Sequence, residues 1–160
     1  MLAINHAMLG DRARNQAFYD ALKQVIEPGK TVVAEIGSGT GLLSVMAVKL
    51  GAKECHLYEM DPDALELSKT LAKQNGIANC TFTLANIRLL ENPEPADVVI
   101  SETLGHHALA ENMIESMEDA KRFLQPNGIL IPGQIKQFVA PVVIDRVQQQ
   151  IDIWNDVGFD

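Results

Sequence analysis

Short apolar runs alternate with longer amphipathic stretches along most of the chain. The short runs predict five strands, over Thr31–Ile36, His56–Glu59, Cys80–Ala85, Asp97–Ser101 and Gly128–Ile131. The amphipathic or continuously apolar stretches predict helices over 11–26, 42–50, 62–74 and 109–124. A sixth strand over 137–144 and a last helix over 145–154 complete the expected order. Strands separated by helices of this length predict an α/β fold with a doubly wound, mostly parallel sheet.

Several residues mark where these elements are expected to begin or end. Asp61 followed by Pro62 is typical of a helix N-terminus, because aspartate caps free amides and proline fits the first helical position. Gly51 is a suitable residue for the end of the helix over 42–50. Residues 126–128 (Pro-Asn-Gly) predict a turn between the helix over 109–124 and the strand over Gly128–Ile131.

Length and composition narrow the class of protein. The 160 residues fit one domain, 1–160, with an N-terminal helical segment over 1–30 and the sheet with its helices over 31–160. The formal net charge of −8 argues against a nucleic-acid partner, which requires clustered lysine and arginine, and suits a cationic ligand. We find no secretory leader and no run long enough to span a membrane, and therefore expect a cytoplasmic protein without membrane contact.

The two cysteines, Cys55 and Cys80, do not form a CxxC motif and have no histidine in ligand spacing. This pattern predicts buried thiols rather than a disulfide or a zinc site. No metal site is expected elsewhere in the sequence.

A glycine-rich loop follows the first strand and opens directly into an apolar helix. Gly37, Gly39 and Gly41 alternate with Ser38 and Thr40, so the backbone is free to turn sharply and approach a ligand. The helix behind the loop offers free amides and a positive dipole end, which suit an anionic group. Glu35, just before the loop, would repel a pyrophosphate but suits the ammonium of S-adenosylmethionine. We therefore favour this methyl donor over NAD as the cofactor, with Glu35, Gly37, Ser38, Gly39 and Gly41 in its site.

Further cofactor contacts are expected where the other strands end, because ligands bind at the carboxyl edge of a parallel sheet. Glu59 ends the second strand, where an acid commonly holds ribose hydroxyls. Asn86 and Ile87 follow the third strand beside the expected adenine, although a plain polar loop explains them nearly as well. Glu102 follows the fourth strand. Arg14 is suited to the carboxylate of the donor or, alternatively, is a solvated helix charge.

The segment after the fourth strand carries the most specific pattern. Ser101-Glu102-x-x-Gly105-x-x-x-x-x-Glu111-x-Met113 resembles the loop with two glutamates in the protein arginine methyltransferases. The resemblance covers nearly the whole chain. Its other segments are Met8–Arg14, Glu35–Ser44, Glu59, Ile129–Pro132 and Trp154–Asp160.

This resemblance implies a Rossmann-like class I methyltransferase fold and catalytic roles for Glu102 and Glu111. Two carboxylates hold a guanidinium by paired hydrogen bonds, draw its positive charge to one side and leave one nitrogen free to attack the methyl group. Each glutamate also has a structural explanation, Glu111 in the first turn of a helix and Glu102 at a strand end.

The chain also departs from the family pattern. Arg88 stands where the family has an acid near the adenine, and the loop lacks the family's aromatic residues, for which this chain has Thr103, His106, Leu109 and Ala110. The family's β-barrel domain is not part of the sequence. We therefore expect an enzyme, an S-adenosylmethionine-dependent methyltransferase acting on a guanidinium or other nitrogen of a protein or small molecule. The alternatives are a cofactor-binding module that is inactive alone, a methyltransferase with a non-arginine small-molecule acceptor, and an NAD-linked oxidoreductase. The oligomeric state is left open.

Overall fold

The described part of the chain contains one parallel sheet. A computed structural model describes residues 8–103, 113–142, 147 and 152. Within this part five strands pair in the order β3-β2-β1-β4-β5, and every neighbouring pair is parallel. Their bounds are β1 Val32–Ile36, β2 Glu54–Glu59, β3 Cys80–Leu84, β4 Ala96–Ser101 and β5 Leu124–Ile131. The doubly wound α/β fold predicted from the sequence is confirmed.

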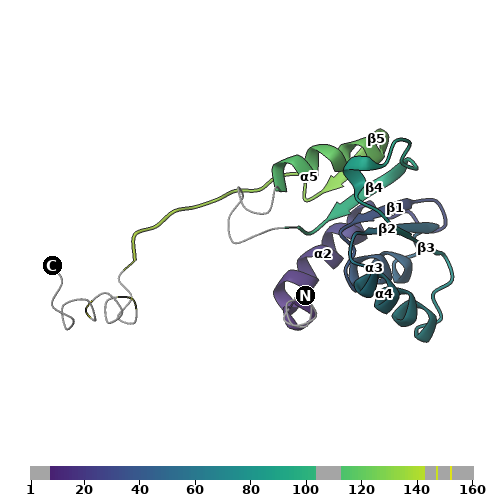
Figure 1. Ribbon diagram of the computed structural model, residues 1–160, viewed down its shortest axis with the longest axis horizontal. Helices are drawn as coiled ribbons and strands as arrows, with labels where there is room; N and C mark the ends of the chain where they lie inside the picture. The colour runs from purple at the N-terminus through teal and green to yellow at the C-terminus, as the bar shows by residue number, and fades with distance from the viewer. Residues whose placement is uncertain (1–7, 104–112, 143–146, 148–151, 153–160) are drawn as a thin grey trace.

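Helices cover both faces of this sheet (Figure 1). Three of them, α2 (Arg12–Val25), α3 (Leu42–Lys49) and α4 (Pro62–Gln74), lie on one side, and α5 (Met113–Ala120) lies on the other. The chain runs outward through β1, β2 and β3 and then returns to β4, which pairs with the other edge of β1. The strand order therefore reverses between β1 and β4, and in such sheets a ligand binds outside the carboxyl ends at this point.

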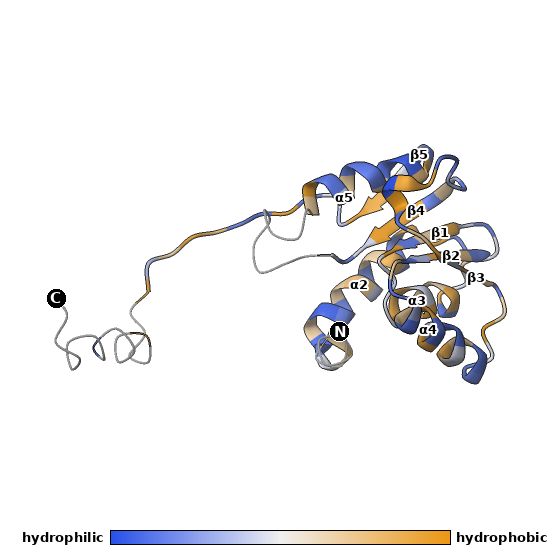
Figure 2. Cartoon of the chain, in the orientation of Figure 1, coloured by the Kyte–Doolittle hydropathy of each residue, from blue (hydrophilic) through white to orange (hydrophobic). Residues whose placement is uncertain are grey.

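Two apolar layers hold the helices to the sheet. On the α3 side, Val33 and Leu57 pack with Leu22 of α2 and Leu43 of α3. On the α5 side, Tyr58 meets Phe123 edge to face, with ring centroids 4.8 Å apart, and Phe123 is fully buried. In Figure 2 strand β4 is coloured largely as hydrophobic. The central strands β1 and β4 are buried along nearly their whole length, which explains why their sequences are apolar runs rather than alternating patterns, whereas the edge strands β3 and β5 are partly exposed.

Side-chain caps place the helix starts where the sequence predicts them. Asp61 accepts hydrogen bonds from the amides of Asp63 and Ala64, at 2.9 and 3.4 Å, and Pro62 is the first residue of α4. Asp11 caps α2 in the same way by accepting from the Arg14 amide at 3.0 Å. These bonds satisfy amides that the first turn of a helix leaves free.

The fifth strand differs from the prediction. It begins at Leu124 rather than Gly128, and the expected helix over 109–124 ends at Ala120, followed by a short 3₁₀ turn, Lys121–Phe123 (η2). The predicted turn over 126–128 is an irregularity inside β5, where the pairing with β4 shifts between Ala96 and Val98. Asn127 has φ +68° at this place. A bulge thus accommodates turn-forming residues within a strand.

The C-terminal elements are only partly within the described residues. The sixth strand predicted over 137–144 is wrong for its described part, 137–142, which has no regular structure. This segment leads away from the sheet in Figure 1 and does not pair with any of the five described strands, and Phe138 and Val139 are 85% and 94% exposed. Of the helix predicted over 145–154, only Val147 and Asp152 are described, and both are helical.

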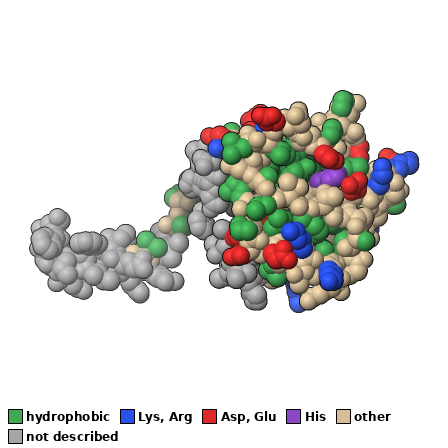
Figure 3. Space-filling model, turned by 45° about the vertical axis from the view of Figure 1, so that its right-hand side comes forward, with side chains coloured by type: hydrophobic (Ala, Val, Ile, Leu, Met, Phe, Trp, Pro, Cys, Tyr) green, Lys and Arg blue, Asp and Glu red, His purple; other side chains and the backbone are tan. Residues whose placement is uncertain are grey.

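No helix among the described residues is long and apolar enough to cross a membrane. On the face of the molecule seen in Figure 3, acidic and basic side chains are interspersed rather than gathered into one patch of either sign.

Candidate functional site

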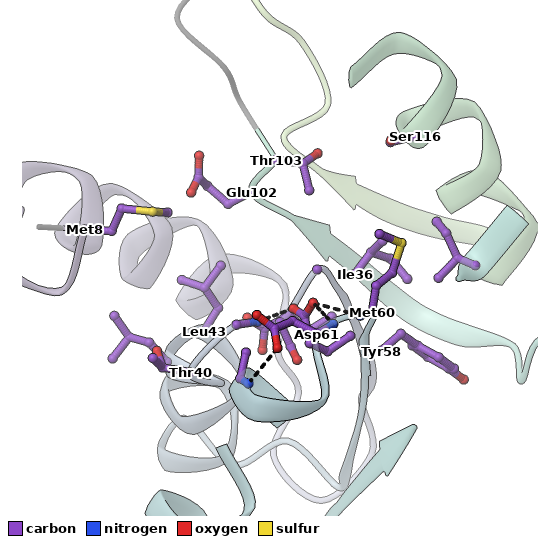
Figure 4. A pocket seen from close by; sticks show the side chains of 18 of the residues that line it. Met8, Ile36, Thr40, Leu43, Tyr58, Met60, Asp61, Glu102, Thr103 and Ser116 are labelled. Atoms are coloured by element: carbon purple, nitrogen blue, oxygen red, sulfur yellow. Dashed lines mark hydrogen bonds between the residues drawn. The ribbon is translucent and has the colours of Figure 1, made fainter. Parts of the chain in front are cut away.

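A cavity of about 810 Å³ lies at the carboxyl ends of β1, β2 and β4, where the strand order reverses. Figure 4 shows its walls: Met8 on one side, Glu102 and Thr103 at the end of β4, Ser116 on α5, and Tyr58, Met60 and Asp61 at the end of β2. Its size suits a small-molecule ligand or cofactor. The cavity is where the sequence predicts a cofactor site.

Backbone contacts fix the glycine-rich loop over the end of β2. The amides of Gly37 and Ser38 donate to the Tyr58 carbonyl, at 2.9 and 3.1 Å. Gly41 has φ +75°, and a Cβ at this position would overlap Ser68 Oγ. Gly39 also has a positive φ, +52°. The alternation of glycines therefore reflects left-handed backbone and close packing against α4, as the sequence predicts.

Glu35 belongs to β1, and its buried side chain lies against the N-terminus of α3. Its Oε2 accepts hydrogen bonds from the amide and the hydroxyl of Ser44, at 2.9 and 2.5 Å. Burial raises the pKa of Glu35 to about 7, and the bonds from Ser44 oppose this rise. The Glu35 carboxyl group therefore already accepts a hydrogen bond from an amide in the first turn of α3, which a bound pyrophosphate would otherwise use. Because Glu35 also lines the cavity, an ammonium placed there would favour its charged form.

Glu59 stabilises the loop as well as facing the cavity. Its Oε2 accepts from the Gly39 amide at 2.8 Å, and its Oε1 accepts from the amides of Met60 and Asp61, at 2.7 and 2.9 Å. A carboxylate has about four acceptor positions, so capacity for a ribose hydroxyl remains. The predicted ligand role of Glu59 stays a prediction, and its structural role joins the end of β2 to the loop.

Arg14 and Glu102 form an ion pair at the mouth of the cavity. Arg14 Nη2 donates to Glu102 Oε2 at 2.5 Å, and both side chains are mostly buried. The Arg14 guanidinium also lies over the ring of Phe18, 5.3 Å from its centroid, and its Nη1 donates to Asn15 at 2.8 Å. Arg14 and Glu102, which the sequence places together among the cofactor contacts, are therefore in direct contact.

The residues after β3 form the opposite wall. Asn86 accepts from the Arg88 amide at 3.1 Å and so begins the short 3₁₀ turn Ile87–Leu89 (η1), in which Ile87 is buried. Arg88 pairs with Asp119 of α5, Nε to Oδ2 at 3.2 Å, and joins the two elements that border this wall. Asn86, Ile87 and Arg88 all line the cavity, as expected for the adenine side.

One predicted catalytic residue, Glu111, lies outside the described residues, so its position relative to Glu102 stays a prediction. The sequence reasoning missed Ser44, which holds Glu35, and Thr103, whose Cγ2 would lie 3.0 Å from a Cβ at Gly37. Ser44 is the third residue of α3, a position whose amide needs a partner. This capping rule is the signal that links it to Glu35.

Two buried polar atoms without a hydrogen-bond partner indicate that the cavity receives a ligand. Among the described residues they are Arg14 Nε and Ser38 Oγ, and both residues line the cavity. Buried polar groups are rarely left unsatisfied. A guanidinium and a hydroxyl fit the carboxylate of an amino-acid group, and Glu35 and Glu59 fit its ammonium and a sugar. The described residues contain no group of three or more metal-ligating side chains that could hold a metal ion.

Comparison with known families decides the class. Residues 15–156 match the family model described as ribosomal protein L11 methyltransferase (PrmA). The chain belongs to this methyltransferase family. The class I methyltransferase fold predicted from the sequence is thereby confirmed.

Individual relatives of this methyltransferase chain are arginine methyltransferases. A probable protein arginine N-methyltransferase 6 from Arabidopsis thaliana is 34% identical over 166 residues, which cover 99% of this chain and 38% of the relative. The ribosomal protein arginine N-methyltransferase rmt3 of Schizosaccharomyces pombe is also 34% identical, over 98% of this chain and 30% of the relative. The resemblance to protein arginine methyltransferases is confirmed.

Solved structures agree with this assignment. The crystal structure of protein arginine methyltransferase 10 from Arabidopsis thaliana has a TM-score of 0.74 and 28% identity, covering 82% of this chain and 38% of that one. A Trypanosoma brucei PRMT1 enzyme–prozyme heterotetrameric complex with AdoHcy gives a TM-score of 0.73 at 25% identity, covering 81% of this chain and 42% of that one. The chain thus spans less than half the length of each of these relatives.

Proposed function

We propose that this chain is the S-adenosylmethionine-binding domain of a methyltransferase whose acceptor is a guanidinium or other nitrogen. The observation that carries the proposal is the ion pair of Arg14 and Glu102 at the mouth of a cavity that contains unpaired buried polar atoms. It places a cation suited to the donor's carboxylate beside a carboxylate suited to a cationic acceptor. The AdoHcy bound by the Trypanosoma brucei relative supports the cofactor.

The residues of the cavity have separate roles in this proposal. Arg14 and Ser38 bind the carboxylate of the donor, Glu35 its ammonium, and Glu59 its ribose, while Asn86 and Ile87 border its adenine. The bound cofactor supplies a methyl group activated by a sulfonium. Glu102 binds and orients the acceptor nitrogen, with Glu111 as the second carboxylate. Orientation of this kind supplies much of the rate increase in a two-reactant transfer.

Cofactor binding is tested by calorimetry with S-adenosylhomocysteine and with NAD, on the wild type and on Gly39→Val. We expect the wild type to bind S-adenosylhomocysteine and not NAD, and Gly39→Val to lose this binding because φ +52° strains a β-branched residue. Binding of NAD in preference to the homocysteine product would overturn the proposal and favour the oxidoreductase.

Methyl transfer is tested separately with labelled donor and arginine-rich peptides. We expect Glu102→Gln and Glu111→Gln to abolish transfer, because a neutral amide does not draw the charge of a guanidinium. Transfer that continues unchanged in both variants would remove the glutamates from the mechanism.

A second candidate function is a cofactor-binding module that needs further protein for catalysis. The matched region is 38% of the Arabidopsis thaliana relative, so that relative's activity belongs to a longer chain and the two candidate functions need separate assays. Donor binding without transfer to any peptide or small-molecule amine would support it. A heterotetramer is described for the Trypanosoma brucei relative, so sedimentation of this chain alone and with a candidate partner is the matching assay.

A further inference from the structure

Cys55 and Cys80 lie directly opposite each other on neighbouring strands. The parallel pairing of β2 and β3 aligns Cys55 with Cys80, so both side chains leave the sheet on the same face. Both belong to the apolar layer beneath α3, in which Cys55 is fully buried and Cys80 is half-buried. The sequence gives no sign of this, since 24 residues separate the two positions.

The separation of aligned residues suits a covalent link. Neighbouring strands lie about 4.8 Å apart, and a disulfide needs a Cα separation of roughly 4.4–6.8 Å with side chains that point the same way. The two thiols already interact. The neighbouring Cys80 thiol and burial raise the pKa of Cys55, whereas Cys55 lowers the pKa of Cys80. Cys80 is therefore the more exposed and the more readily ionised thiol of the two.

A short chain of contacts leads from this pair to the cavity. Cys55 Sγ donates to the Ser44 carbonyl at 3.8 Å. Ser44 in turn holds Glu35 through its amide and its hydroxyl, and Glu35 lines the cavity. Cys55 is thus connected through Ser44 to Glu35, a residue of the proposed donor site.

We propose that Cys55 and Cys80 form a reversible dithiol–disulfide pair, whose oxidation ties the start of β3 to the start of β2, away from the cavity, and weakens cofactor binding through Ser44 and Glu35. The second half of this statement rests on the proposed function. The oxidant is a low-molecular-weight disulfide.

The exchange proceeds in two steps. The Cys80 thiolate attacks one sulfur of the external disulfide, forms a mixed disulfide and releases the first thiol. Cys55 then attacks Cys80 Sγ, closes the intrachain disulfide and expels the second thiol, which takes up the proton of Cys55. The external disulfide is reduced to two thiols while the two protein thiols are oxidised. A strong external dithiol reverses both steps.

The test is incubation of the folded chain with oxidised glutathione, followed by intact-mass measurement. We expect loss of two hydrogen atoms, one monomeric band without reductant, and full reversal by dithiothreitol. Because the link closes a loop in the unfolded chain, the melting temperature should rise by roughly 5 °C or more. A persistent glutathione adduct, an unchanged mass or a disulfide-linked dimer would overturn the pair.

Two matched variants separate the roles of the thiols. Cys55→Ser should stop at the mixed disulfide on Cys80, because no second thiol displaces the glutathione. Cys80→Ser should show no change in mass, because Cys55 is fully buried. The Cys80 substitution is at a half-buried position, so it keeps the test valid if Cys55→Ser does not fold. A glutathione adduct on Cys80→Ser, or no adduct on Cys55→Ser, would contradict the assignment.

The link to the cavity is measured as the affinity for S-adenosylhomocysteine before and after oxidation. A disulfide has no S–H group, so Ser44 loses the weak bond from Cys55, and we expect binding to weaken by about two- to five-fold. Equal affinity in both forms would remove the effect on the cavity. Failure of the reduced protein to bind would instead count against the proposed function, so the two failures are distinguishable.

Discussion

Arg14 Nη2 and Glu102 Oε2 are 2.5 Å apart, although 88 positions separate the two residues in the chain. The pair holds the start of α2 against the end of β4, at the mouth of the cavity. In the proposed function Arg14 binds the donor's carboxylate, so Glu102 and the donor compete for one guanidinium. Binding of the donor would then free Glu102 for a cationic acceptor.

The first prediction concerns Arg14. We expect Arg14→Gln to weaken S-adenosylhomocysteine binding by about 10- to 100-fold, because a charge-assisted bond is worth roughly 1.5–3 kcal/mol. Calorimetry measures this. Arg12→Gln is the matched control, since Arg12 is in the same turn of α2 but exposed and outside the cavity lining. Equal losses in both variants would point to a general charge effect.

The second prediction concerns Glu102, the ion-pair partner of Arg14. Because Glu102 competes with the donor for Arg14, Glu102→Gln should bind S-adenosylhomocysteine at least as tightly as the wild type. The same variant should lose methyl transfer. Measuring affinity and transfer on one preparation checks both statements. A Glu102→Gln protein that binds much more weakly would show that Glu102 supports the donor site instead of competing with it.

The sequence predicts the fold well because its strongest signals are local. Asp61 and Pro62 place the start of α4, and the apolar runs place the buried strands, within two residues except in β5. The error in β5 arises because Asn127, a turn residue by type, is accommodated in a bulge that depends on pairing with β4. The pairing of two segments that are distant in the sequence cannot be predicted from the residues of either segment alone.

The sequence predicts several residues that line the cavity, but it does not predict the contacts that they make within the protein. Glu35, Glu59 and Arg14 line the cavity as expected. Their partners within the protein were not foreseen, because each partner comes from another element: Ser44 for Glu35, the loop amides for Glu59 and Glu102 for Arg14. Cys55 and Cys80 are a further example, since only strand register brings them together.

A third prediction tests the close packing at the glycine-rich loop. Gly41 has φ +75°, and an added Cβ would overlap Ser68 Oγ and come within 3.1 Å of Leu57 Cδ2. We expect Gly41→Ala to lower the free energy of unfolding by about 2–4 kcal/mol. Gly76→Ala is the matched control, because Gly76 has φ +68° but nothing within 4 Å. It should cost only about 1 kcal/mol.

Urea unfolding of both variants gives the comparison. Equal destabilisation would show that backbone strain alone, and not the contact of the loop with α4, accounts for the cost at Gly41.

The fourth prediction is a pH dependence that originates at Glu35. Its pKa is about 7 in the folded protein and 4.5 without perturbation, so the folded state binds the proton more tightly. The contribution of Glu35 to the free energy of unfolding is therefore highest below pH 4.5, falls as the pH rises to about 7, and is then constant. The total loss is roughly 3 kcal/mol, from about 1.4 kcal/mol for each pH unit.

Glu35→Gln keeps an oxygen acceptor for Ser44 but does not titrate, so it should remove this loss. Relative to the wild type, the variant should gain roughly 2–3 kcal/mol of stability between pH 5 and pH 8, measured by urea unfolding at each pH. Glu66→Gln is the control, because the Glu66 side chain is 72% exposed and its substitution should leave the slope unchanged. If the Glu35→Gln and wild-type curves run parallel, the buried carboxyl group is not the source of the pH dependence, and its charge is compensated within the site at every pH.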